Sequence, residues 1–318
     1  MNQRGLWEGD LVPELLSLSV DYVNKMYVKP LPAKEPSDIV VDVVIPVLNE
    51  AHVLAQSVGK LRQFLTSMLP YRWRVVIVDN GSTDATAEVA NRLTEENRDV
   101  QFLRLEKRGR GRALRHAWMQ SSADMVCYMD VDLSTDLTGL LPTLHALHKE
   151  GYDIAVGSRL MRGARIRRSL KREVISRIYN VFLKAVLLTH FSDAQCGFKA
   201  LTNEAVERLV PQVKDEAWFF DTELLVLAEK QGYRIKDIPV VWIEDSDTRV
   251  KILRTAWEDI KGVFRVRRLL WSREFATATA LYSKRAGATD LPPKMPAGAR
   301  ELVGLSTPAH PDLPSGLD

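Results

Sequence analysis

Runs of β-branched and aliphatic residues alternate with amphipathic segments through the first half of the chain. The runs at 39–46, 73–78, 101–105 and 123–129 predict buried strands, because their apolar residues are nearly continuous. Helical patterns follow the first three runs, over 51–65, from about residue 85 and from about residue 110. Strands and helices that alternate at such short intervals predict an α/β fold with a mostly parallel, doubly wound, twisted sheet and flanking helices.

Polar side chains follow three of these predicted strands at their carboxyl ends. They are Asn49 and Glu50, then Asp79 and Asp84, then Asp130 and Asp132. Because ligands bind beyond the carboxyl ends of parallel strands, we expect these loops to form one site, with Asp130 and Asp132 as oxygen ligands of a divalent cation. An Asp-x-Asp pair alone is weak evidence, since the chain has another at 245–247 and such residues also serve turns and helix caps.

A glycine-rich loop, 109–111, precedes the helix expected from about residue 110. Leu114 stands where a dinucleotide-binding fingerprint would need its third glycine, and the loop does not follow the first strand. The loop is interpreted either as a close backbone approach with a cationic contact to phosphate, or as a plain turn.

Charge is unevenly distributed in this 318-residue chain of net charge +3. Segment 158–177 holds eight basic residues and one acid, and segment 251–273 holds seven basic residues and two acids. Such segments predict anionic partners, namely phosphates or a lipid surface, and we expect no nucleic-acid partner. The two cysteines, Cys127 and Cys196, lack the Cys-x-x-Cys spacing of a redox site and predict a reducing compartment. No signal peptide or spanning segment is predicted.

Several motifs in order resemble the inverting family 2 glycosyltransferases of GT-A fold, and among them the polyprenyl-phosphate (dolichyl-phosphate) sugar synthases. The motifs lie at 44–50, 78–84, 130–132, 157–159, 193–199, 218–224 and 238–242. Ser134 stands where the mannose-transferring members usually have Gln, which favours the glucose-transferring branch or a bacterial relative. The resemblance implies transfer of a hexose from a UDP- or GDP-sugar to a polyprenyl monophosphate, with Mg²⁺ or Mn²⁺.

The resemblance also implies roles for individual residues. The nucleotide-sugar site would contain Pro46, Val47, Asn49, Glu50, Asp79, Ser82, Asp84, Arg110, Gly111, Arg112, Asp130, Val131, Asp132 and Gln195. Asp79 or Asp84 would accept a hydrogen bond from the base, and Arg110 or Arg112 would approach the diphosphate. Asp130 and Asp132 would hold the metal ion.

The acceptor side of the site depends on basic residues and one acid. Arg159, Arg172 and Arg249 are expected at the lipid phosphate, whereas the other arginines of 162–168 are expected in a solvated loop. Asp221 falls where other family 2 enzymes place a catalytic base. It would either act so or only orient a neighbour, because a phosphate acceptor is already an anion. A saccharide or other hydroxyl acceptor, which needs that base, and a non-catalytic nucleotide-binding protein are the alternatives.

Four segments are expected along the chain. They are an N-terminal helix and linker (1–37), a catalytic domain (38–250), basic amphipathic helices (251–283) and a proline-rich disordered tail (284–318). Segment 251–283 has a stripe of Leu253, Trp257, Ile260, Phe264 and Trp271, which predicts either binding to a membrane surface or packing on the core. We therefore expect a peripheral protein on the cytoplasmic face of a membrane, and leave open whether it forms a homo-oligomer or has a membrane-protein partner.

Overall fold

The computed structural model describes residues 34–167, 170–243 and 252–271, with no description of the side chains of 170–172 and 252–256. The predicted N-terminal helix, the tail 284–318 and Arg249 lie outside the described residues. In the part described, no helix combines the length and the apolarity needed to cross a bilayer.

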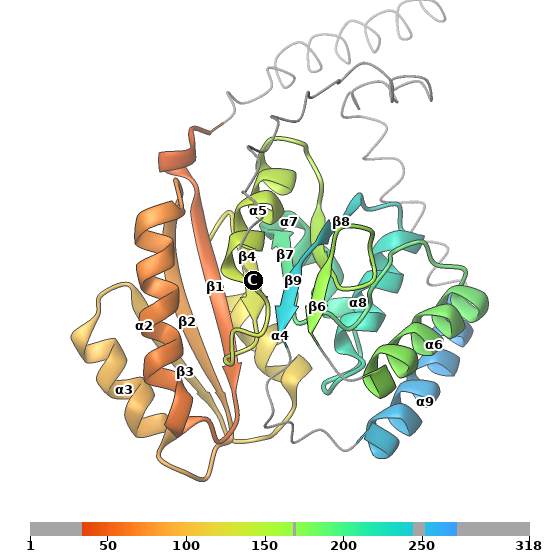
Figure 1. The fold of residues 1–318 in the computed structure, drawn as a ribbon, viewed down its shortest axis with the longest axis horizontal. Helices are drawn as coiled ribbons and strands as arrows, with labels where there is room; N and C mark the ends of the chain where they lie inside the picture. Colours follow the sequence, from red (N-terminus) through yellow and green to blue (C-terminus); the bar gives the residue numbers. More distant parts are fainter. Residues whose placement is uncertain (1–33, 168–169, 244–251, 272–318) are drawn as a thin grey trace, which may run out of the picture.

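A seven-stranded mixed sheet, with strand order β3-β2-β1-β4-β7-β5-β8, forms the centre of the molecule (Figure 1). Its strands are β1 (Val40–Val47), β2 (Arg72–Asn80), β3 (Val100–Leu105), β4 (Met125–Met129), β5 (Ile154–Ser158), β7 (Phe198–Thr202) and β8 (Ile235–Pro239). All neighbouring pairs are parallel except β4 with β7 and β5 with β7, which are antiparallel. The predicted α/β class with a mostly parallel sheet is therefore confirmed.

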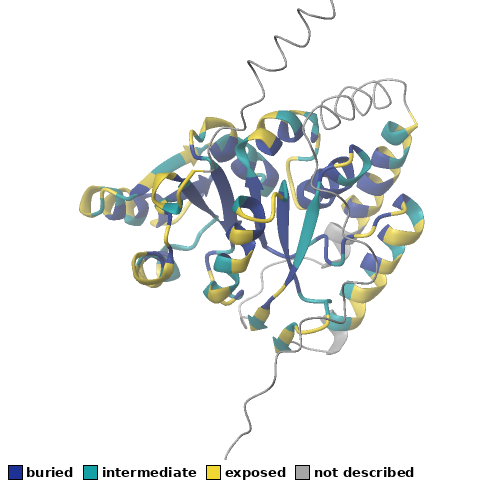
Figure 2. Cartoon of the chain, turned by 90° about the horizontal axis from the view of Figure 1, so that it is seen from above, coloured by how far each residue is buried: buried dark blue, intermediate teal, exposed yellow. Residues whose placement is uncertain are grey.

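Helices cover both faces of the sheet, so the strands are buried between two layers (Figure 2). The helices are α2 (Ala51–Met68), α3 (Thr86–Glu96), α4 (Arg110–Gln120), α5 (Leu140–His148), α6 (Leu170–Leu187), α7 (Asn203–Leu209), α8 (Phe220–Lys230) and α9 (Ile252–Leu270), with short 3₁₀ turns at Pro36–Asp38, Leu137–Gly139 and Val210–Gln212. Along β1, Val43 and Ile45 pack under α2, α3 and α5, whereas Val44 packs toward α4 and α8. This alternation is the period of two expected for a strand buried on both faces.

The order of the strands places the expected site. β1 lies between β2 and β4 and runs parallel to both, so their carboxyl ends share one edge of the sheet. β7 enters beside β4 from the opposite direction and pairs Lys199 with Tyr128. An antiparallel strand there carries residues from the second half of the chain to the end of β4.

Two features differ from the sequence-based expectation for the basic segments. Arg165 and Arg167, expected in a solvated loop, are exposed but lie on β6 (Arg165–Arg167), which pairs in parallel with β9 (Val241–Ile243). On α9, Trp257, Ile260, Phe264 and Trp271 of the predicted stripe are exposed, so the stripe does not pack on the core; Val263 and Val266, on another side of the helix, are buried against the domain. α9 packs beside α6 (Figure 1).

Candidate functional site

The loops after β1 and β2 are joined by hydrogen bonds at the shared edge. The Asn49 N–H donates to Ser82 Oγ at 2.8 Å, and the Thr83 N–H donates to Asn49 Oδ1 at 2.8 Å. Asn49 has φ 58°, a left-handed conformation that asparagine tolerates better than most residues. The Glu50 N–H donates to Thr86 Oγ1 at 2.8 Å, so the start of α3 completes this cross-link.

The two acids of the second loop differ in the hydrogen bonds they make. Asp84 Oδ1 accepts from the backbone and hydroxyl of Thr86, which stabilises the start of α3. Asp79 is fully buried, and its Oδ1 accepts from the Ser82 N–H at 2.9 Å. Within the described residues its Oδ2 has no hydrogen-bond partner, and Arg104 Nε lies 3.6 Å from it. Asp79 therefore offers a buried acceptor atom, whereas Asp84 is used locally.

Arg110 and Asp130 form an ion pair at the end of β4. Arg110 Nη2 lies 2.6 Å from Asp130 Oδ1. Its guanidinium also lies over the rings of Tyr128 and Trp218, 5.3 Å and 4.9 Å from their centroids, so it is held from several sides. Partial burial raises the pKa of Asp130, the charge of Arg110 opposes that rise, and neighbouring carboxylates add to it. A Cβ at Gly197 would overlap Asp130 Oδ2, so only glycine leaves this carboxylate its place.

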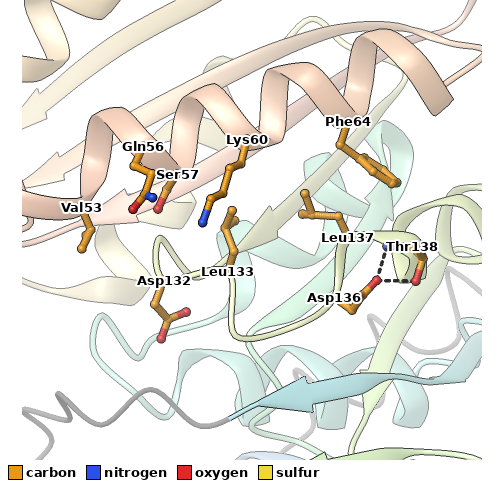
Figure 3. Close-up of a pocket in the computed structure, with 10 residues that line it drawn as sticks. All are labelled: Val53, Gln56, Ser57, Lys60, Phe64, Asp132, Leu133, Asp136, Leu137 and Thr138. Atoms are coloured by element: carbon orange, nitrogen blue, oxygen red, sulfur yellow. Dashed lines mark hydrogen bonds between the residues drawn. The ribbon is translucent and has the colours of Figure 1, made fainter.

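Asp132 lies in a tight turn after β4. The Ser134 N–H donates to Asp132 Oδ1 at 2.9 Å, and Leu133 has φ 52°, a strained conformation for leucine. The exposed Asp132 lines a pocket between α2 and segment 132–138, with Lys60 and Ser57 on the α2 side. Figure 3 shows the Asp132 carboxylate directed away from α2, on the far side of the turn from Lys60.

The pair Asp130 and Asp132 fits a divalent cation that also binds a diphosphate. Both supply the hard oxygen ligands that Mg²⁺ and Mn²⁺ prefer, and the lack of a side chain at Gly197 makes room for the Asp130 carboxylate. In the described part of the chain, no group of three or more His, Cys, Asp and Glu side chains forms a ready metal cage. Such an ion would therefore take its remaining ligands from substrate phosphates and water, as Mg²⁺ usually does.

The glycine loop differs from the expectation that its backbone approaches a phosphate. The N–H groups of Gly111 and Arg112 donate instead to the carbonyls of Ala217 and Glu216, at 3.2 and 3.1 Å. A Cβ at Gly111 would overlap Phe220, so this glycine serves close packing of α4 on α8. Of the two arginines expected at the diphosphate, Arg110 lies beside Asp130, whereas Arg112 forms an ion pair with Glu216.

Asp221, at the start of α8, is buried and contacts Tyr128, the residue over whose ring Arg110 lies. Its Oδ1 accepts a hydrogen bond from the Tyr128 hydroxyl at 2.6 Å and lies 3.2 Å from Lys199 Nζ. Burial and the Asp221 carboxylate raise the pKa of Tyr128 well above its ordinary value, so its hydroxyl stays protonated and donates.

The remaining predicted residues have other partners or lie on other elements. Arg159 makes a bidentate ion pair with buried Asp193, through Nε at 2.8 Å and Nη2 at 3.0 Å. Gln195 Nε2 donates to Asp259 Oδ2 of α9 at 2.7 Å. Arg172 lies in the first turn of α6, with no description of its side chain. Pro46 and Val47 end β1, and Val131 is buried between the two acids of the fourth loop.

Sequence reasoning missed Tyr128, Asp193, Lys199 and Trp218 as parts of the site. Only Lys199 gives a signal in the sequence, since it is a lone charged residue inside the apolar run 198–201. An isolated lysine in a buried strand needs a counter-ion. The position of that counter-ion, Asp221, cannot be read from spacing because it comes from a different element.

The chain is similar to several known proteins. The model of the family described as "Glycosyl transferase family 2" matches residues 42–210. Glycosyltransferase AglD of Haloferax volcanii is 37% identical over 233 residues, which are 73% of this chain but 37% of AglD, so the chain spans little more than a third of that relative. Dolichyl-phosphate beta-glucosyltransferases are 27% identical over 248 residues in Dictyostelium discoideum and 26% over 238 residues in Saccharomyces cerevisiae. Those matches cover 74% and 69% of this chain and 76% and 71% of the relatives.

Solved structures show the same fold. The crystal structure of glucosyl-3-phosphoglycerate synthase from Mycobacterium tuberculosis, in complex with Mn²⁺, UDP-glucose and phosphoglyceric acid, matches with a TM-score of 0.57 at 16% identity. The match covers 72% of this chain and 80% of that chain. At this identity the likeness concerns the fold.

Proposed function

Because the chain belongs to glycosyl transferase family 2, and so is a glycosyltransferase, we propose that it transfers glucose from a nucleotide diphosphate sugar to a polyprenyl monophosphate, with inversion at the anomeric carbon. The observation that carries the proposal is the Arg110–Asp130 pair at the sheet edge formed by β1, β2 and β4. The dolichyl-phosphate beta-glucosyltransferases of Dictyostelium discoideum and Saccharomyces cerevisiae, which align with 74% and 69% of the chain, support the choice of sugar and acceptor.

The donor would bind across this edge. Asp79 Oδ2, buried and without a hydrogen-bond partner among the described residues, is suited to accept from a base N–H. Asn49 and Glu50 would lie along the ribose, and Arg110 would face the diphosphate as a fixed cation. UDP-glucose is our choice of donor because a protein of the same fold binds it.

Asp130 and Asp132 would hold Mg²⁺ or Mn²⁺ at the diphosphate. When bound, this ion would neutralise negative charge that grows on the departing nucleoside diphosphate. Arg110 would add a second cation on the same side, already held in place by Asp130 and two aromatic rings. Charge compensation that needs no rearrangement is an effective way to lower such a barrier.

The acceptor would come from a membrane surface. α6 and α9 each expose a helical stripe of apolar side chains, Val174, Ile178 and Val181 on α6 and Trp257, Ile260 and Phe264 on α9. Exposed basic residues accompany them, among them Arg177, Lys184 and Lys261. Apolar and basic side chains together match an anionic lipid surface. The basic segment that follows β5 and continues into the first turn of α6, where Arg172 lies, would meet the lipid phosphate.

The proposal is tested by incubating the purified protein with UDP- and GDP-hexoses, a polyprenyl phosphate and Mg²⁺ or Mn²⁺. We expect a glucose-bearing lipid from UDP-glucose, with a β-anomer from the α-linked donor by NMR. Transfer to a soluble saccharide in place of the lipid phosphate would contradict the proposed acceptor. Nucleotide binding without any transfer would contradict the proposed enzymatic role.

A further inference from the structure

Lys199 is a charged side chain with no exposed surface in the middle of the sheet. It lies on β7, opposite Tyr128 of β4. Its Nζ donates to the Cys196 carbonyl at 2.6 Å, lies 3.2 Å from Asp221 Oδ1, and lies 3.4 Å from the Tyr128 hydroxyl. These three contacts account for the three protons of the ammonium group.

A buried ion pair of this kind is not explained by stability. Removing two charges from water costs several kcal/mol per ion, and apolar residues of similar volume are often at least as stabilising. The pair is instead connected to the proposed site through a series of contacts. The Tyr128 hydroxyl donates to Asp221, and the Arg110 guanidinium lies over the Tyr128 ring. Arg110 in turn forms the ion pair with Asp130.

We propose that Lys199 is a positioning residue of the glycosyl transfer, which holds the Asp221 carboxylate in place so that Asp221, through Tyr128, orients Arg110 toward the donor diphosphate. The proposal rests on the function proposed above and deepens it. In this arrangement Asp221 Oδ1 is engaged by both the Lys199 ammonium and the Tyr128 hydroxyl.

This arrangement selects the class of acceptor. An oxygen of a phosphate anion attacks the anomeric carbon, the new C–O bond forms, and the old bond breaks with its electron pair leaving on the nucleoside diphosphate. No proton has to be removed in that step. A hydroxyl acceptor would have to lose a proton, and Oδ1 of the buried carboxylate at this position is already engaged by Lys199 and Tyr128. The contacts of Asp221 therefore favour a phosphomonoester acceptor over a free alcohol.

The test uses two double variants of the full chain that remove both charges of the buried pair. In K199M/D221N the amide oxygen can still accept from Tyr128, whereas in K199M/D221L nothing can. We expect both to melt within a few degrees of the wild-type protein, whereas K199M alone melts lower because it leaves Asp221 unpaired. We expect UDP with Mn²⁺ to bind about 10- to 100-fold more weakly to K199M/D221L than to K199M/D221N, since leucine leaves the buried Tyr128 hydroxyl without an acceptor.

Equal UDP affinity in the two folded double variants would overturn the orientation of Arg110 through Tyr128. Equal UDP affinity in folded K199M and the wild-type protein would overturn the positioning role of Lys199, whatever the acceptor proves to be. The acceptor class is tested with wild-type protein, UDP-glucose and either a polyprenyl phosphate or the corresponding prenol. Product from the phosphate alone is expected, and comparable product from the prenol would overturn the acceptor selection. Product from neither lipid contradicts the function proposed above and the acceptor selection, while the UDP measurement still decides the role of Lys199.

Discussion

The outward stripe of α9 gives the most quantitative prediction. Trp257 and Phe264 are 59% and 62% exposed. An aromatic side chain has roughly 200 Å² to bury, so each exposes roughly 120 Å². Full transfer of that area into lipid would contribute about 3 kcal/mol per residue at about 25 cal/mol per Å². If half of it enters the interface, the two residues together contribute roughly 3 kcal/mol, which is roughly a 100-fold change in partitioning.

We therefore expect W257E/F264E to bind vesicles of phosphatidylcholine and phosphatidylglycerol about 100-fold more weakly than wild type in a sedimentation assay. The matched control is M68E/M119E, because Met68 and Met119 are also about half exposed but lie on α2 and α4. The control should bind vesicles as wild type does, and both variants should keep the wild-type melting temperature. Unchanged binding by W257E/F264E, or an equal loss in the control, would refute the assignment of this surface.

Three further substitutions test the site and its support. D132A should lower transfer at least about 100-fold with an unchanged melting temperature, since Asp132 is exposed; normal turnover would remove it from the metal site. G197A should weaken binding of Mn²⁺ with UDP at least about tenfold by displacing Asp130, whereas G139A, whose added Cβ meets only ordinary contacts, should leave it unchanged. Burial raises the pKa of Asp259 from 3.8 to about 6, so the folded state holds a proton there more tightly than the unfolded state does. The stabilisation by the protonated carboxyl group is present below about pH 4 and is lost as the pH rises through 6. D259N should therefore gain up to about 3 kcal/mol in unfolding free energy relative to wild type between about pH 4 and pH 7, measured by urea titration, and a constant difference would argue against it.

The strands that carry the site follow from local pattern alone. A run rich in β-branched residues such as Val40–Val47 is typical, in an α/β fold, of a strand covered on both faces. Once strands alternate with helices, their carboxyl ends share an edge, so the clustering of Asn49, Asp79 and Asp130 was predictable without coordinates.

Other features depend on contacts between residues far apart in the chain, which spacing does not encode. Arg110 and Arg112 look equivalent in the sequence, yet their partners differ. The carbonyls of segment 216–217 accept hydrogen bonds from the N-terminal backbone of α4, and Glu216 forms an ion pair with Arg112. Arg110 forms its ion pair with Asp130. Likewise, Lys199 reaches Tyr128 and Asp221 only because β7 enters the sheet antiparallel to β4. Local propensity determines which segments become strands and helices, whereas the partner of a buried charge is decided by which elements pack together to exclude water.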